Sequence, residues 1–188
     1  MRAKILIVDD DRDILLGLEN RIAWMGHEPV TTDNGKDALR LIEQGEFDLA
    51  LLDLELPGLS GLEVLERVKG ASRSAPQTEK DTSSAYTTPL IVILTAFGTI
   101  ERAVQAMQCG AFDFLTKPFN ADHLTVVVNK ALATVTLHRQ VDVLRQEVDD
   151  RYEHLVGTNA KMVAQLTIAK QAAQTDVTVL LFGETGTG

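Results

Sequence analysis

Short apolar runs alternate with stretches of helical periodicity along the first two-thirds of the chain. The apolar runs lie at 4–8, 28–31, 48–52, 90–94 and 112–115, and helical spacing follows at 14–25, 37–44, 62–68, 99–108 and from 122 onwards. The run at 4–8 lacks apolar–polar alternation, which is typical of a strand buried on both faces of a sheet. Strands that alternate with helices predict right-handed crossovers, and therefore a doubly wound, five-stranded parallel sheet of the α/β class.

The composition changes between Gly70 and Pro89. Eleven of these 20 residues are Ser, Thr, Pro or Gly, and no large aliphatic residue is present. Such a segment buries too little apolar surface to offset the entropy of ordering it. We therefore predict a flexible insertion at 70–89. Because it connects a helix to a strand, it should lie at the sheet edge opposite to the strand ends and leave their chemistry intact.

A long helical segment over 122–154 follows the last predicted strand. One set of positions repeats every seven residues and a second set falls between them: Val127, Thr134, Val141, Val148 and Leu155, then Leu137 and Leu144. Lys130 and Arg151 interrupt the second set, so two good central heptads remain, fewer than the roughly three or four that define a coiled coil. The segment is either a dimeric coiled coil or one amphipathic helix that packs on its own domain. The coiled coil is favoured because the stripe continues beyond the predicted sheet domain.

Charge and composition exclude several classes of protein. The net charge of −9 disfavours a nucleic-acid surface, which is normally basic. The single cysteine, Cys109, cannot form an internal disulfide, which suits a reducing cytosol. No signal-peptide core follows the N-terminus, and no apolar stretch approaches the roughly 18 residues that cross a bilayer. These features predict a soluble, cytoplasmic protein without a membrane segment.

Polar side chains stand where four of the five predicted strands end. They are Asp9, Asp10 and Asp11 after the first run, Asp53 after the third, Thr95 after the fourth and Lys117 after the fifth. The carboxyl ends of parallel strands meet at one sheet edge, where open α/β proteins bind ligands. Convergent carboxylates repel one another unless a cation neutralises them, and Mg²⁺ prefers all-oxygen ligands. N-capping of the next helix also explains the triplet alone; the remaining residues favour a metal-dependent site that accepts a phosphoryl group.

These residues, in this order, resemble the response-regulator receiver domain of two-component signalling, over roughly the first two-thirds of the chain. The resemblance implies a flavodoxin-like fold with Asp53 as the phospho-accepting nucleophile and a sensor histidine kinase as the donor. It assigns Mg²⁺ to Asp9, Asp10 and Asp53, with the backbone carbonyl of Glu55. A turn-rich segment at 56–61 is expected to leave the Asp53 carboxylate exposed. The implied activity is Mg²⁺-dependent self-phosphorylation and slow autodephosphorylation, so we do not expect a conventional enzyme.

The same resemblance assigns three further side chains. Thr95 would bind a phosphoryl oxygen, and Lys117 would pair with the acyl phosphate. Phe114 stands where the family has its switch aromatic, so Thr95 and Phe114 would form the switch; phenylalanine lacks a tyrosine hydroxyl but keeps the rotamer coupling. The Lys117–Pro118 bond would be cis, as is usual in this family.

The chain ends in a glycine-rich segment, 183–188, directly after a predicted helix at 162–173 and a predicted strand at 177–182. The segment contains Gly183, Gly186 and Gly188 and fits the first six positions of the phosphate loop G-x-x-x-x-G-K-[ST], although a flexible tail explains it equally well. The residues upstream, 155–182, resemble the opening of the AAA+ domain of sigma-54-dependent, nitrogen-regulator-class activators. The resemblance implies a fragment cut inside its ATP site, with ATP bound only by the full-length parent.

We therefore expect three segments: a receiver at 1–121, its last helix extended as a linker at 122–154, and an incomplete AAA+ start at 155–188. The parent protein would be a homodimeric activator, switched by phosphorylation and working with sigma-54 RNA polymerase and DNA. Two alternatives are a phosphorylation-independent dimerisation or interaction module, which the intact acidic set opposes, and a nucleotide hydrolase. The absence of a phosphate-loop lysine opposes the second alternative.

Overall fold

The computed structural model describes residues 2–45, 47–74, 88–96 and 100–155, together with isolated positions between 164 and 182. The chain divides into two compact units, Met1–Asp142 and Val143–Gly188. Apart from those isolated positions, the helix predicted at 162–173, the strand predicted at 177–182 and the glycine-rich loop at 183–188 lie outside the described residues. The fold described below is that of the first unit, with the one helix that continues past its end.

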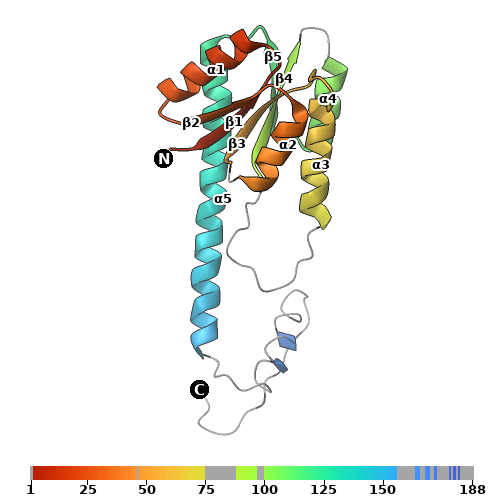
Figure 1. Ribbon diagram of the computed structural model, residues 1–188. Helices are drawn as coiled ribbons and strands as arrows, with labels where there is room; N and C mark the ends of the chain where they lie inside the picture. The colour runs from red at the N-terminus through yellow and green to blue at the C-terminus, as the bar shows by residue number, and fades with distance from the viewer. Residues whose placement is uncertain are drawn as a thin grey trace. The chain divides into compact units, whose positions relative to one another are not determined.

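Five parallel strands form a single sheet in the first unit (Figure 1). They are β1 (Lys4–Val8), β2 (Glu28–Thr32), β3 (Leu49–Asp53), β4 (Leu90–Ala96) and β5 (Asp113–Lys117). The strand order is β2-β1-β3-β4-β5, so the chain winds outwards in both directions from the centre. This arrangement confirms the predicted doubly wound, flavodoxin-like α/β fold.

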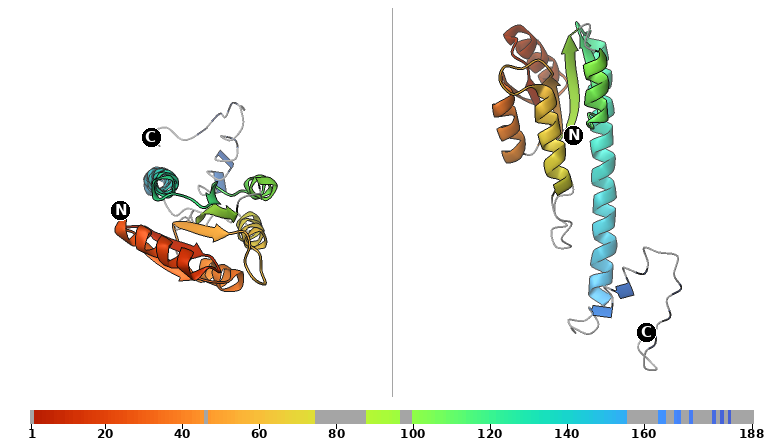
Figure 2. Two further views of the ribbon diagram at one scale, coloured as in Figure 1. Left: turned by 90° about the horizontal axis from the view of Figure 1, so that it is seen from above. Right: turned by 90° about the vertical axis from the view of Figure 1, so that its right-hand side faces the viewer.

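Helices cover both faces of this sheet (Figure 2). They are α1 (Arg12–Trp24), α2 (Gly35–Gln44), α3 (Gly61–Ser74), α4 (Ile100–Gln108) and α5 (Ala121–Leu155). Alternate residues of each strand serve opposite faces: Ile5 and Ile7 pack with α1 and α5, whereas Leu6 and Val8 pack with α2 and α3. All four side chains are fully buried, and each such burial contributes about 1.5–3 kcal/mol. Two-sided burial explains why the sequence of β1 shows no alternation of apolar and polar residues.

Local signals in the sequence set the ends of several helices. Ser60 and Glu63 form a reciprocal capping box at the start of α3, since the Glu63 carboxylate accepts from the Ser60 amide at 3.0 Å and the Ser60 hydroxyl accepts from the Glu63 amide at 3.3 Å. Gly26 follows α1 at φ +86° and Gly110 follows α4 at φ +98°. Both angles lie in the left-handed region that glycine adopts without steric cost.

The third helix is longer than the sequence predicted. The expected flexible insertion began at Gly70, but α3 continues through Gly70 to Ser74. Ala71 and Arg73 are strong helix formers, and adding residues to an existing helix is far cheaper than nucleating one. The low content of apolar residues was therefore a poor guide to where the helix ends. The rest of the predicted insertion, 75–87, lies outside the described residues.

Helix α5 begins as a packed helix and continues as an exposed one. Leu124 and Val128 are buried against the sheet and Val135 is also buried, whereas Leu137 and Val141 are 59% and 37% exposed. Leu144, further along the same stripe, is 60% exposed. Of the seven-residue stripe, packing on the domain therefore accounts for Val127, which is 4% exposed, and not for these three residues. Among the helices that the structure describes, none is long and apolar enough to cross a membrane.

Candidate functional site

The strand register brings the predicted site residues to one edge of the sheet. Val8 pairs with Leu52, so the next residue, Asp9, lies level with Asp53. Asp53 pairs with Leu94, and Thr95 follows directly; on the next strand Ala96 pairs with Lys117. The strands β1, β3, β4 and β5 therefore end at the same edge of the sheet. This is the carboxyl edge, where open α/β sheets bind ligands.

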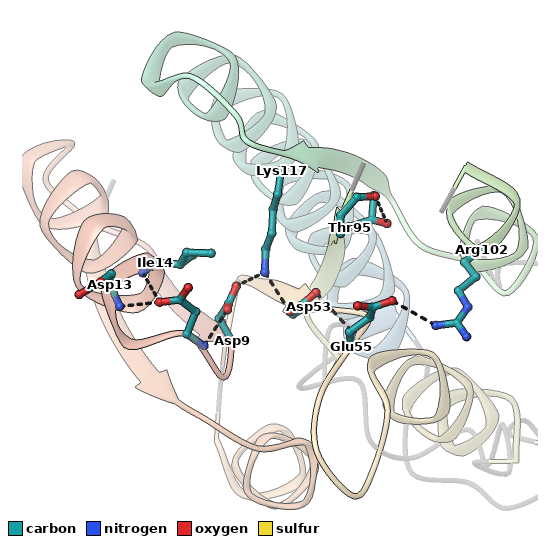
Figure 3. A network of polar contacts seen from close by, with 10 residues as sticks. Asp9, Asp13, Ile14, Asp53, Glu55, Thr95, Arg102 and Lys117 are labelled. Carbon is teal, nitrogen blue, oxygen red and sulfur yellow. Dashed lines mark hydrogen bonds and ion pairs between the residues drawn. The ribbon is translucent and has the colours of Figure 1, made fainter. Parts of the chain in front are cut away.

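Lys117 connects the ends of three strands (Figure 3). Its Nζ lies 2.6 Å from Asp9 Oδ2 and 2.8 Å from Asp53 Oδ2. Asp9 is fully buried and Asp53 is only 4% exposed, so the expectation of an exposed Asp53 carboxylate is wrong. The turn-rich segment after Asp53 returns to the end of β3, where the Gly61 amide donates to the Leu54 carbonyl at 3.2 Å, and Lys117 contacts the carboxylate. The Lys117 ammonium lies between the two buried carboxylates and compensates negative charge there.

Burial and ion pairing act against each other at this site. Burial raises the pKa of Asp9 above its usual value, despite the opposing effects of the Lys117 ammonium and of the Asp11 amide. Burial acts to lower the pKa of Lys117, but its hydrogen bonds and charge interactions with Asp53 and Asp9 outweigh this effect and raise it. The lysine is therefore firmly protonated at neutral pH. Its contribution to stability is complete below its usual pKa of 10.5 and is lost only as the pH rises through the raised value.

The acidic residues at this edge form a group that fits a hard divalent cation. Carboxylate oxygens of Asp9, Asp10 and Asp53 lie within 4.8 Å of one another. Asp9 Oδ2 is buried, and its ion-pair contact in the described part of the chain is with the Lys117 ammonium. Three carboxylates face one ammonium, which leaves excess negative charge. Oxygen ligands, excess negative charge and an open side at the exposed Asp10 match the requirements of Mg²⁺.

Two residues of the acidic triplet, Asp9 and Asp11, have different roles. Asp11 is the N-cap of α1, and its side chain accepts from the amides of Asp13 and Ile14. Asp9 instead lies in the site, where its Oδ1 accepts from the Asp11 amide at 3.1 Å. Helix capping and a charged site were alternative explanations of the triplet, and each holds for a different residue.

The remaining predicted residues lie around this carboxylate group. Thr95 is 1% exposed, and its hydroxyl donates to the Ala96 carbonyl at 3.4 Å. The Glu55 amide donates to Asp53 Oδ1 at 3.3 Å. Phe114 lies on β5 and is 37% exposed, and the Lys117–Pro118 bond is cis, as the family resemblance implied. The glycines of the predicted phosphate loop, Gly183, Gly186 and Gly188, lie outside the described residues.

One further charged residue at this site was not predicted from the sequence. Arg102, on α4, pairs with the Glu55 carboxylate at 3.5 Å, on the far side of Asp53 from Lys117 (Figure 3). The two side chains are 61% and 55% exposed, so the pair adds no more than about 1 kcal/mol of stability. An arginine on an amphipathic helix is usually a solvated residue, and only the fold reveals that it reaches the loop after β3.

The fold and this edge define a class of signalling domain, and comparison with known families agrees. Residues 5–129 match the family described as the response regulator receiver domain, so the chain belongs to that family. Domains of this family accept phosphoryl groups from histidine kinases and generally bind Mg²⁺ at an acidic pocket.

Similar proteins extend well beyond this chain. This chain is 28% identical to the regulatory protein AtoC of Escherichia coli K12 and 32% identical to the DNA-binding transcriptional regulator NtrC of Azospirillum brasilense. The matches cover 98% and 99% of this chain but only 38% and 36% of those relatives. The crystal structure of NtrX from Brucella abortus in complex with ADP is also similar, with a TM-score of 0.63 and 34% identity, over 93% of this chain and 35% of that one.

Proposed function

We propose that Asp53 is the residue that accepts the phosphoryl group from a sensor histidine kinase. A carboxylate oxygen of Asp53 attacks the phosphorus of a phosphohistidine, the phosphorus–nitrogen bond breaks, and the imidazole leaves with that electron pair. The product is an aspartyl phosphate. The observation that carries this proposal is the position of Lys117 Nζ, 2.8 Å from Asp53 Oδ2, where an ammonium can stabilise added negative charge.

Neighbouring groups would hold the transferred phosphoryl group. Lys117 would pair with one phosphoryl oxygen, and the Thr95 hydroxyl, at the end of β4, would bind another. Asp9, Asp10, Asp53 and the Glu55 carbonyl would hold Mg²⁺, which when bound neutralises charge on the phosphoryl oxygens. Thr95 and Phe114 would then change position together and pass the charge change at Asp53 to the surface of β5.

Removal of a metal ligand provides a first test. Asp10→Ala should weaken Mg²⁺ binding by about tenfold or more, because a hard divalent ion loses one of its few carboxylate ligands. Phosphorylation by acetyl phosphate at limiting Mg²⁺ should fall in parallel. Isothermal titration calorimetry measures the affinity. Asp11→Ser is the matched control, since serine keeps the N-cap of α1 and should leave the affinity unchanged. Equal Mg²⁺ affinity in Asp10→Ala and wild type would exclude Asp10 from the metal site.

The parent protein is proposed to be a sigma-54-dependent transcription activator whose ATPase and DNA-binding parts follow this chain. The sequence of 155–188 supports this proposal, because it resembles an AAA+ opening, and so does the similarity to a DNA-binding regulator and to a protein crystallised with ADP. Phosphorylation of Asp53 would then control promoter opening by sigma-54 RNA polymerase. We propose a cytoplasmic location, in keeping with the single cysteine.

We also propose that α5 forms a homodimer through the stripe that contains Leu137, Val141 and Leu144. These side chains are exposed on the single chain, and they follow the seven-residue repeat. An apolar stripe of this length is stabilised when a second copy covers it.

A charge placed in that stripe tests the dimer. Leu144→Lys removes the burial of one leucine per chain, which costs about 1.5–3 kcal/mol for each side chain, and brings two ammonium groups together. The variant should be monomeric at micromolar concentration in sedimentation equilibrium, with an unchanged far-ultraviolet circular dichroism spectrum. Val143→Lys is the matched control, because Val143 is 54% exposed but lies off the stripe. A dimer that persists in Leu144→Lys would place the interface on the receiver, near α4 and α5.

A further inference from the structure

A buried carboxylate lies at the edge of the sheet opposite to Asp53. Asp48 directly precedes β3, and its side chain is 8% exposed. One oxygen accepts from the Lys4 amide at 2.8 Å, and the other lies 2.5 Å from Arg139 Nη2. Arg139 is 91 residues further along the chain, on α5. The pair therefore joins the amino edge of the two central strands to the last helix.

The position of Arg139 on α5 shows which part of the helix this contact holds. The helix packs on the sheet through Leu124, Val128 and Ala131, and Val135 is the last buried apolar residue described on the helix. Arg139 follows Val135 by four residues, so it lies on nearly the same face, about 40° further round. It therefore extends the packed face by one turn after apolar packing has ended. The compact unit ends just beyond it, at Asp142.

The opposite face of the same turns is apolar and exposed. Leu137 lies two residues after Val135, which places it about 200° away around the helix. Val141 is on the same side of the helix as Leu137, and both are exposed. A rotation of this segment about its axis would turn these residues towards the sheet. The contact between Arg139 and Asp48 opposes such a rotation, because a buried carboxylate that loses its cation is left with uncompensated charge.

We propose that the Asp48–Arg139 ion pair is the anchor by which the receiver holds the 136–142 turn of α5. It fixes this turn against the amino edge of the sheet and sets the rotation of the turn about the helix axis. The anchor itself depends only on the fold. Its effect on dimerisation rests on the proposed function of the Leu137, Val141 and Leu144 stripe.

Backbone amide exchange of the full 188-residue chain tests the anchor directly. Arg139→Met keeps the aliphatic stem but removes the charge and the hydrogen bond, and amides at 136–142 should exchange about tenfold faster. Arg139→Lys restores the charge and should recover most of the protection. A side chain with a merely structural role would not be replaced by lysine in this way. Lys130→Met is the matched control. Lys130, on the same helix, pairs with Asp113 of β5 at 2.8 Å. The buried side chains of Val127 and Val128 already hold the turn around Lys130, so exchange should be unchanged.

Two further outcomes separate the anchor from the proposed function. The same acceleration should appear when Arg139→Met is combined with Asp53→Asn, since the anchor does not depend on phosphorylation. If the wild-type chain is a dimer, Arg139→Met should weaken it although the stripe is untouched; a monomeric wild type would refute the dimer and leave the exchange result standing. Exchange rates at 136–142 within twofold of wild type in Arg139→Met would overturn the anchor. Failure of Arg139→Lys to restore protection would also overturn it.

Discussion

Replacing Asp53 by asparagine should reduce phosphorylation of this chain by acetyl phosphate and Mg²⁺ to background. An amide oxygen is a far poorer nucleophile than a carboxylate, and the neutral side chain also loses its ion pair with Lys117. The covalent adduct is measured by intact-protein mass spectrometry under conditions that preserve acyl phosphates. This is the largest functional effect expected from any single substitution, because the reaction cannot proceed without its nucleophile.

The control for this experiment separates the site from general effects of charge. Asp33→Asn removes an exposed carboxylate just before α2 and should be labelled like wild type. Circular dichroism should show that both variants are folded. If Asp53→Asn were labelled to the same extent at one other residue, Asp53 would not be the acceptor, although the chain would still be a receiver by fold.

The largest expected loss of stability comes from Gly61→Ala. A methyl group at Gly61 would lie 1.9 Å from the Asp53 carbonyl oxygen and 3.0 Å from the Leu54 Cα, so backbone must move. Forcing the start of α3 away from the end of β3 should cost about 1–3 kcal/mol or more. The same movement would displace the Asp53 backbone, so Mg²⁺ affinity should fall as well. Urea denaturation measures the first effect and calorimetric titration the second.

Gly70→Ala is the matched control because it lies in the same helix. A methyl group there meets nothing within 4 Å, and the backbone is ordinary helix. Alanine should therefore stabilise the protein by about 0.5–1 kcal/mol, the usual gain when a helix-interior glycine is replaced. Equal stability of Gly61→Ala and wild type would show that α3 can begin further from β3 than the structure places it.

The strand pattern was sufficient to predict most of the fold. Fully apolar runs such as Ile5 to Val8 can only be buried on both faces, which requires helices on each side and hence crossovers. Parallel strands then bring every carboxyl end to one edge, so the proximity of Asp9, Asp53 and Lys117 follows from topology alone. The spacing of residues in the sequence did not predict how deeply Asp53 is buried, because its burial depends on the path of the loop that follows β3.

Other features could not be predicted because they depend on pairs of residues that are distant in sequence. Nothing near Asp48 indicates that it binds Arg139, and nothing near Arg102 indicates that it reaches Glu55. The end of α3 was mispredicted for a different reason. Composition measures how much surface a segment can bury, whereas a helix that has already formed can continue through residues that bury very little.

The three environments of the acidic triplet limit what other sequences of this kind can tolerate. Only Asp9 is both buried and in contact with Lys117, while Asp10 faces solvent and Asp11 caps a helix. Over evolutionary time the third position is free to drift to serine, threonine or asparagine, which cap equally well, while the first has no such substitutes. Two chains that share all but the first of these aspartates would look nearly identical in composition, yet one of them would lack the buried carboxylate that pairs with Lys117.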